Sequence, residues 1–312
     1  MFPERQPEPH REWKEEVAFL DAIFTNGAAY TVGKVNGDHW LLYITTPGII
    51  KRTTPNSSEV LPSAHVNDAI QPLSASNDSE TSLPDYTIEI LMSGLSREAR
   101  EPFFFSQPPS PLEGESSESL PSITGQTLSA ALGITDIFPP HLATLDAYAF
   151  SPCGYSSNAL IKWGDSVSEA DGGEGYYTIH VTPEEGWSYA SFECNVPLSA
   201  APVSSTKEIP DLQTLIRRVV DIFQPAKLNV TLFISKQANS DSEEDEAESV
   251  IEAAQRDFKC ALSSCSPLSF SSTASDDSHG SADSYTGGYR RTDKINYEFG
   301  GYNLAFASFE LR

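Results

Sequence analysis

The stretch YYTIHVTPEEGWSYASFECN, Tyr176–Asn195, contains two strand patterns joined by a short turn. Apolar and polar side chains alternate in its first half, and this period of two predicts a strand with one face in a core. The core-facing residues are Tyr177, Ile179 and Val181. Pro183 ends regular pairing, and Glu185-Gly186 is typical of a turn before the second strand, WSYASFE.

The polar face of the same stretch carries candidate functional groups. Thr178, His180 and Thr182 share it, Glu184 stands at the strand end, and Glu193 ends the second strand. A histidine that titrates near neutral pH can shuttle protons, and a carboxylate can accept hydrogen bonds from two ribose hydroxyls. A structural histidine with satisfied hydrogen bonds is the alternative, and this strand alone does not decide between them.

Other segments show clear secondary-structure patterns. Strands and hairpins outnumber helices and do not follow a regular βαβ alternation, which indicates an α+β protein with largely antiparallel sheets. The patterns are a helix over Arg11–Phe24, a hairpin over Ala28–Ile44, a strand over Asp85–Leu95, a short helix in TLSAALGI, a helix over Asp211–Phe223 capped by Asp211, a strand over Leu228–Ser235 and final strands in KINYEFGGYNLAFASFEL.

Low-complexity segments separate these patterns. Residues 46–82 form a linker or disordered insert rich in Ser, Pro, Thr and Asn, and further inserts lie near 105–122, 236–247 and 263–288. They divide the chain into a unit over residues 1–45 and a larger one over 83–312.

The net charge of −24 excludes nucleic acid and anionic membranes as expected partners, since phosphate-binding surfaces need clustered Lys and Arg. Much of this acidity can equally be a solubilising surface, although it also suits a cationic ligand. The four cysteines match neither a metal site nor a disulfide framework, so no metal is expected. No apolar run is long enough for a bilayer, and we expect a cytoplasmic protein.

Two further groups of polar residues carry candidate chemistry. PCGYSSN reads as a tight turn that could place the hydroxyl of Ser156 or Ser157 beside His180; an ordinary Ser-rich turn gives the same composition. Asp85, Thr87 and Glu89 share one strand face, which suits an amine ligand but is also typical of a solvent-exposed face.

Several blocks, in order, resemble eukaryotic S-adenosylmethionine decarboxylase, a pyruvoyl-dependent family, and the resemblance suggests a fungal member. The blocks cover roughly half of the chain and are PHREWKEEVAFLDAIFTNGAAYTVGKVNGDHWLLY, DYTIEILMSGL, AFSPCGYSSNAL, YYTIHVTPEEGWSYASFE, LIRRVVDIFQPAKLNVTLF and YNLAFASF. The resemblance implies a four-layer αββα sandwich of antiparallel sheets made from two related halves. Residues 1–45 would be the remainder of the N-terminal repeat and residues 83–312 the C-terminal repeat.

The resemblance also implies a reaction and its participants. Decarboxylated S-adenosylmethionine supplies spermidine and spermine synthesis. The pyruvoyl group comes from self-cleavage of the precursor at a Glu-Ser-Ser site, forms a Schiff base with the substrate and acts as an electron sink. Putrescine is an activator in many members, and a homodimer is the implied assembly.

Site residues follow by motif from the same resemblance. Ser156 and His180 resemble the pair that assists self-processing. Phe150 resembles the aromatic residue that stacks on adenine, and Glu184 resembles the carboxylate that holds the ribose. The putrescine site is expected at Asp85, Thr87, Glu89, Glu193 and Tyr302.

The family block that carries the self-cleavage serine precedes the segment resembling PHREW and is absent from this chain. One Glu-Ser-Ser occurs, at residues 115–117, but it lies in a Ser-rich insert without a strand context. We therefore expect a C-terminal portion of the enzyme that is inactive in isolation. The alternatives are a truncated fragment and a non-catalytic paralog that binds putrescine or regulates a full-length enzyme.

Overall fold

The computed structural model describes residues 7–34, 36, 39–45, 86–105, 120–164, 173–198, 209–235, 250–263, 288–299 and 302–312. The chain divides into two compact units, Met1–Leu83 and Pro84–Arg312. Each unit is described by itself. The assignment of these units to two related repeats stays a prediction.

The first unit contains one helix and one hairpin. Helix α1 (Trp13–Asp21) is shorter than the pattern over Arg11–Phe24, and none of its residues is buried. Strands β1 (Gly27–Gly33) and β2 (His39–Thr45) pair antiparallel, with Gly33 opposite His39. The predicted hairpin is confirmed.

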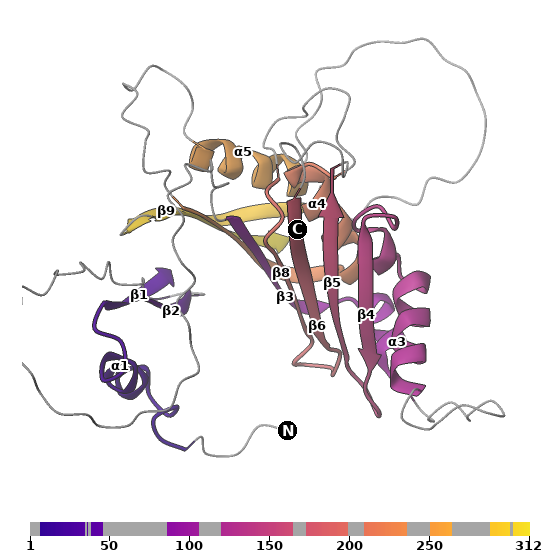
Figure 1. The fold of residues 1–312 in the computed structure, drawn as a ribbon, viewed down its shortest axis with the longest axis horizontal. Coiled ribbons are helices and arrows are strands. Elements are labelled where there is room, and N and C mark those ends of the chain that lie inside the picture. The colour runs from indigo at the N-terminus through magenta and orange to yellow at the C-terminus, as the bar shows by residue number, and fades with distance from the viewer. Residues whose placement is uncertain are drawn as a thin grey trace, which may run out of the picture. The chain divides into compact units, whose positions relative to one another are not determined.

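The second unit is built on one eight-stranded sheet in which all neighbouring strands are antiparallel (Figure 1). The α+β class with antiparallel sheets is thereby confirmed. In sheet order the strands are β4 (Ala143–Ala149), β5 (Tyr155–Trp163), β6 (Gly173–Thr182), β7 (Tyr189–Cys194), β3 (Tyr86–Leu95), β8 (Pro225–Ser235), β10 (Tyr302–Leu311) and β9 (Tyr289–Phe299).

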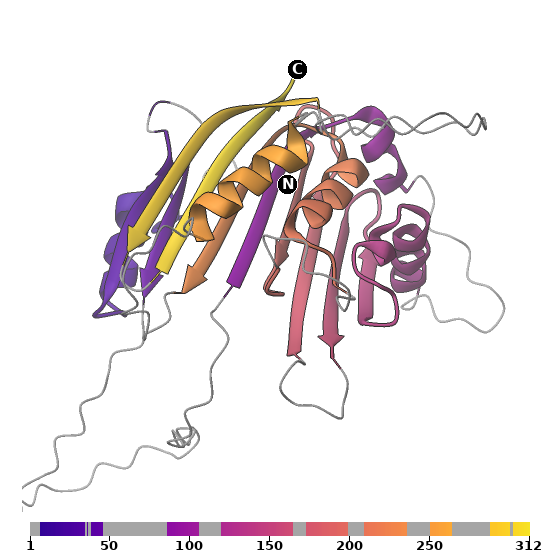
Figure 2. The ribbon, with the colours of Figure 1, turned by 90° about the horizontal axis from the view of Figure 1, so that it is seen from above.

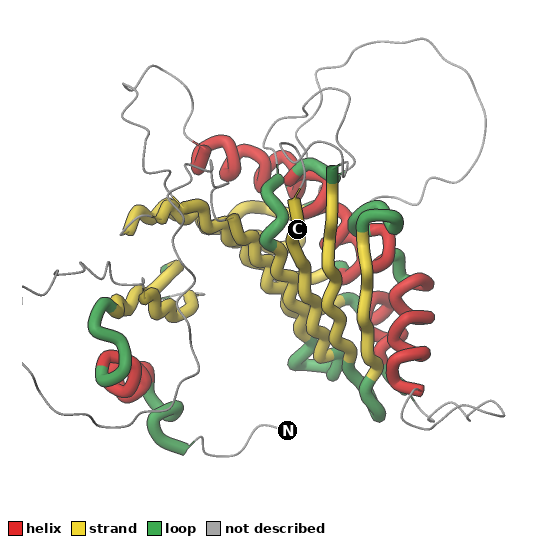
Figure 3. The backbone as a smooth tube through the Cα atoms, in the orientation of Figure 1, coloured by secondary structure: helices red, strands yellow, loops and turns green. Residues whose placement is uncertain are grey.

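The longer helices of this unit cover one face of the sheet, as Figures 2 and 3 show. They are α3 (Leu120–Ala131), α4 (Leu212–Phe223) and α5 (Val250–Leu262). Two short elements, α2 (Arg97–Arg100) and η1 (Glu101–Phe103), follow β3, and η2 (Ile134–Asp136) follows α3. Helix α4 begins as predicted, because the Asp211 side chain accepts a 2.7 Å hydrogen bond from the Thr214 amide.

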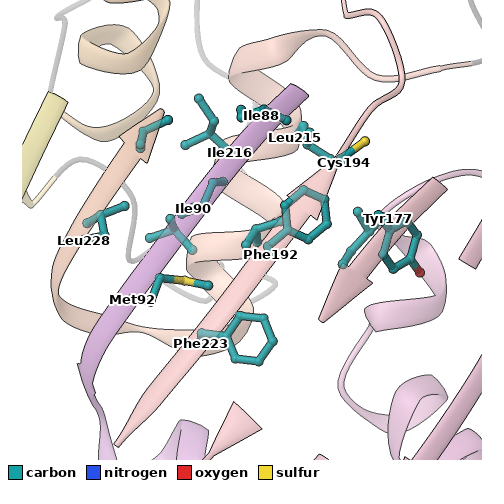
Figure 4. Close-up of a cluster of buried hydrophobic side chains, with 14 of the residues drawn as sticks. Ile88, Ile90, Met92, Tyr177, Phe192, Cys194, Leu215, Ile216, Phe223 and Leu228 are labelled. Carbon is teal, nitrogen blue, oxygen red and sulfur yellow. The ribbon is translucent and has the colours of Figure 1, made fainter. Parts of the chain in front are cut away.

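The core lies between this helical layer and the sheet (Figure 4). Alternate residues of β3 enter it, in agreement with the predicted period of two. The ring of Phe192 stacks on Tyr177 with 5.6 Å between centroids. The labelled members are Ile88, Ile90, Met92, Tyr177, Phe192, Cys194, Leu215, Ile216, Phe223 and Leu228.

The structure corrects three predictions. Only the first residues of PCGYSSN form a turn, where Gly154 adopts φ +113°, and Tyr155 already begins β5, a strand that the sequence pattern did not predict. The strand predicted in WSYASFE begins at Tyr189, two residues later. Helix α3 begins at Leu120, inside the insert predicted for residues 105–122. The inserts at 46–82 and 236–247 lie outside the described residues.

Candidate functional site

The face of the sheet opposite the helices carries the polar residues of β5, β6, β7 and β3. Ser156 and His180 are directly opposite each other on β5 and β6, and Ser156 Oγ lies 2.8 Å from His180 Nδ1. His180 is exposed and Ser156 half-buried. The hydroxyl can donate to Nδ1 when the ring proton is on Nε2, which holds the imidazole in one orientation.

Two glutamates face each other on the same side of the sheet. Glu89 on β3 is opposite Glu193 on β7, at a spacing where side chains on one face interact. Burial, followed by the negative charge of Glu193, raises the pKa of Glu89 to about 7. Thr87, two residues before Glu89 on β3, points to the same face. Asp85 lies outside the described residues.

The register brings these two groups together. His180 is opposite Ser191 on β7, and Thr178 is opposite Glu193. His180 and Glu193 are therefore diagonal neighbours on one face of adjacent strands. The structure places the predicted processing pair and the predicted acidic pair in one continuous polar surface.

Two tyrosines belong to this surface although no site role was predicted for them. The Tyr176 hydroxyl donates a 3.0 Å hydrogen bond to Glu193 Oε1. Burial, followed by this hydrogen bond, raises the pKa of Tyr176. Burial and the charge of Glu89 raise the pKa of Tyr189. The period of two that selected His180 also selects Tyr176, so that pattern could have found it.

A second cluster lies at the end of β6. Glu184 is exposed on the turn after this strand, and the Cys153 thiol hydrogen-bonds to it; burial, then the charge of Glu184, raises the pKa of that thiol. Phe150, just before the Cys153 turn, has 49 % of its surface exposed. Trp187, in the turn before β7, is 83 % exposed.

Tyr302 is farther from the acidic pair than the other predicted members. It lies on β10, which is separated from β3 by β8. Leu304, rather than Tyr302, is at the level of Thr87, because both are opposite Phe233 on β8. Tyr302 points to the same side of the sheet as Leu304 and is opposite Ser235 at the end of β8.

Within the described ranges, no group of His, Cys, Asp or Glu side chains could hold a metal ion. In the same part of the chain, no helix combines the length and apolar character needed to cross a membrane.

Comparison with known proteins gives consistent matches. The family model for adenosylmethionine decarboxylase matches residues 1–310. S-adenosylmethionine decarboxylase proenzymes are similar over most of the chain: that of Xenopus laevis is 30 % identical over 99 % of this chain and 62 % of its own length. That of Drosophila melanogaster is 33 % identical over 75 % of this chain and 52 % of its own length.

A solved structure, that of Trypanosoma brucei AdoMetDC-delta26, is 18 % identical, with a TM-score of 0.49 and coverage of 100 % of this chain and 81 % of that one. The chain spans between half and two thirds of the length of the curated relatives named above. Because the family model matches nearly every residue of the sequence, the chain belongs to the adenosylmethionine decarboxylase family.

Proposed function

We propose that this site serves the decarboxylation of S-adenosylmethionine, which supplies spermidine and spermine synthesis. The observation that carries the proposal is the Ser156–His180 contact of 2.8 Å on the same sheet face as Glu89 and Glu193. His180 thus contacts a serine on one neighbouring strand and lies diagonal to a half-buried acidic pair on the other side. Membership of the family supplies the reaction class.

The residues suit a pyruvoyl group that would form from a serine of the extended precursor. His180 is exposed, and its Nδ1 can also carry the ring proton and donate to Ser156 Oγ. In that tautomer Nε2 is unprotonated and can take up a proton during the self-cleavage that makes the group. Ser156 keeps the imidazole in the orientation that this proton transfer needs. Once formed, the group supplies the electron sink for loss of carbon dioxide.

The adenosyl part of the substrate is assigned to the cluster at the end of β6. Glu184 is exposed, and its carboxylate has lone pairs for two ribose hydroxyls besides the contact with Cys153. The exposed ring of Phe150 offers a face on which adenine can stack. The sulfonium charge suits a protein with a net charge of −24.

The acidic pair is assigned to putrescine. Burial, and then repulsion between the two facing carboxylates, raises the pKa of Glu89. An ammonium group between them removes this repulsion and donates hydrogen bonds to both carboxylates. Thr87 adds a hydroxyl on the same face. Asp85 and Tyr302 are proposed as further members of the putrescine site.

The chain alone is expected to be inactive, since its Glu-Ser-Ser at residues 115–117 is in a Ser-rich segment. Genomic and transcript sequence upstream of Met1 should then encode an in-frame Glu-Ser-Ser block. The extended protein should release carbon dioxide from carboxyl-labelled S-adenosylmethionine, and the 312-residue chain should not. A stop codon directly upstream, with transcripts beginning at this Met1, contradicts the proposal.

If the protein has a non-catalytic role, different results are expected from the 312-residue chain and its extended form. A regulatory paralog would bind putrescine or change the activity of a full-length relative on mixing, without activity in any extended form. The fungal origin, the homodimer and the cytoplasmic location stay predictions, for which the source genome, sedimentation and cell fractionation are the direct measurements.

A further inference from the structure

A short segment after β3 is attached to both sides of the Phe150–Glu184 cluster. This segment, residues 96–105, contains α2 and η1 and is called the bracket below. Its base is fixed to the end of α4: the Ser96 amide donates to Gln224 O at 3.0 Å, and the Ser96 hydroxyl donates to Gln224 Oε1 at 2.8 Å. Ser96 also caps α2 by accepting from the Ala99 amide at 3.1 Å.

One side of the bracket holds the turn that follows Phe150. The Gly154 amide donates to Phe103 O at 3.0 Å, and the Phe105 amide donates to Pro152 O at 2.8 Å. The Phe103 ring is fully buried, with 5.6 Å between its centroid and that of Tyr155. This end of the bracket is therefore anchored in the core as well as in backbone hydrogen bonds.

The other side holds the turn that carries Glu184. Arg100 of α2 has only 16 % of its side chain exposed. Its Nη1 lies 3.5 Å from Pro183 O, and its Nη2 lies 3.5 Å from Glu185 Oε1. The guanidinium thus contacts Pro183, the residue before Glu184, and Glu185, the residue after it. The Glu184 carboxylate is not one of these two acceptors.

We propose that Arg100 is a positioning residue that sets the spacing between Glu184 and Phe150. The inference rests on the proposed function, which assigns these two side chains to the ribose and the adenine. The physical reason is that the planar guanidinium can donate to two acceptors at once, here Pro183 O and Glu185 Oε1. A lysine ammonium at this position would be a point charge and could not replace both contacts.

Hydrogen exchange of the 312-residue chain tests the positioning role without any ligand. The Trp187 amide, which donates to Glu184 O at 3.1 Å, reports on the turn. Arg100→Met keeps the apolar stem but removes both contacts, and we expect exchange at Trp187 to accelerate about tenfold, with Arg100→Lys intermediate. Arg97→Met is the matched control, since Arg97 is on the same helix with 78 % of its side chain exposed.

Two exchange results would overturn the proposal. Arg100→Met exchanging like Arg97→Met would show that the guanidinium does not hold the turn. An acceleration that is equal at Trp187 and in β8 would show a general loss of stability instead of local positioning.

The second measurement links the turn to the substrate. In the active extended enzyme, Arg100→Met should raise KM for S-adenosylmethionine about tenfold with kcat changed less than twofold, because ground-state contacts are weakened without touching the reacting atoms. Arg97→Met should leave both unchanged. A fall in kcat with unchanged KM contradicts the spacing role. A wild-type enzyme without activity contradicts the proposed function, and the exchange result still decides the role of Arg100.

Discussion

The Ser156 hydroxyl and the His180 imidazole meet across neighbouring strands, with Ser156 Oγ 2.8 Å from His180 Nδ1. The backbone register places them directly opposite each other, so the contact does not depend on a mobile loop. Catalytic groups held on strands of a packed sheet keep their geometry better than groups on loops.

The first prediction concerns this pair in an extended, self-cleaving form of the protein. His180→Ala should leave an uncleaved precursor on a denaturing gel, with cleavage at least about a hundredfold slower, because a positioned general base contributes about that much or more. Ser156→Ala should slow cleavage less, because the imidazole is retained and only its orientation is lost. Cleavage of His180→Ala at the wild-type rate contradicts the role assigned to the histidine.

The second prediction concerns stability and pH. The pKa of Glu89 is about 7 in the folded protein against an ordinary value of 4.5, so the folded state holds more protons between these values. Stability from this group is present below pH 4.5 and is lost as the pH rises through about 7. Glu89→Gln should therefore be more stable than the wild type at pH 8, with the difference shrinking toward pH 5, in urea unfolding of the chain.

Glu174→Gln is the control for this pH series. Glu174 is an exposed glutamate of β6 whose pKa is lowered by its 2.7 Å contact with Lys162, so its small contribution has the opposite sign. If Glu89→Gln shows the same pH dependence as the wild type, the pKa of Glu89 is not raised in the folded protein, which contradicts the prediction.

Periodicity was sufficient to predict the faces of β3 and β6, because each strand buries one face under helices and leaves the other polar. It failed for β5, where Gly154 and a run of small polar residues resemble a turn even though Ser157 points into the core. Small residues have weak strand propensity, and there the pairing with β4 and β6 determines the structure.

In the candidate site, too, the sequence did not predict contacts that depend on strand pairing. The resemblance named Ser156 and His180, but only the register shows that His180 and Glu193 are diagonal neighbours. Arg100 carried no sequence signal, since a single arginine in a short helix is ordinary on any surface. Its contacts with Pro183 and Glu185 arise from elements more than 80 residues apart and need the folded sheet.

The third prediction concerns the start of α4. Asp211→Ala removes the side-chain oxygen that accepts from the Thr214 amide at 2.7 Å. We expect a loss of about 1 kcal/mol in the free energy of unfolding, measured with urea, and recovery of most of it in Asp211→Ser. Equal losses in both variants would indicate that the cap does not contribute through this hydrogen bond.

The fourth prediction concerns the core between β7 and α4. The side chain of Phe192 is fully buried and stacks on Tyr177, so Phe192→Ala removes both apolar burial and a ring contact and leaves a cavity. The expected loss is about 3–5 kcal/mol in the free energy of unfolding, and Phe192→Leu should lose less because it fills more of the space. Leu160 is the matched control, since its side chain on β5 is 69 % exposed and Leu160→Ala should change stability by no more than about 0.5 kcal/mol. A loss at Leu160 as large as that at Phe192 would mean that this part of β5 is packed against another surface in solution, and the comparison therefore measures whether the Leu160 side chain is free.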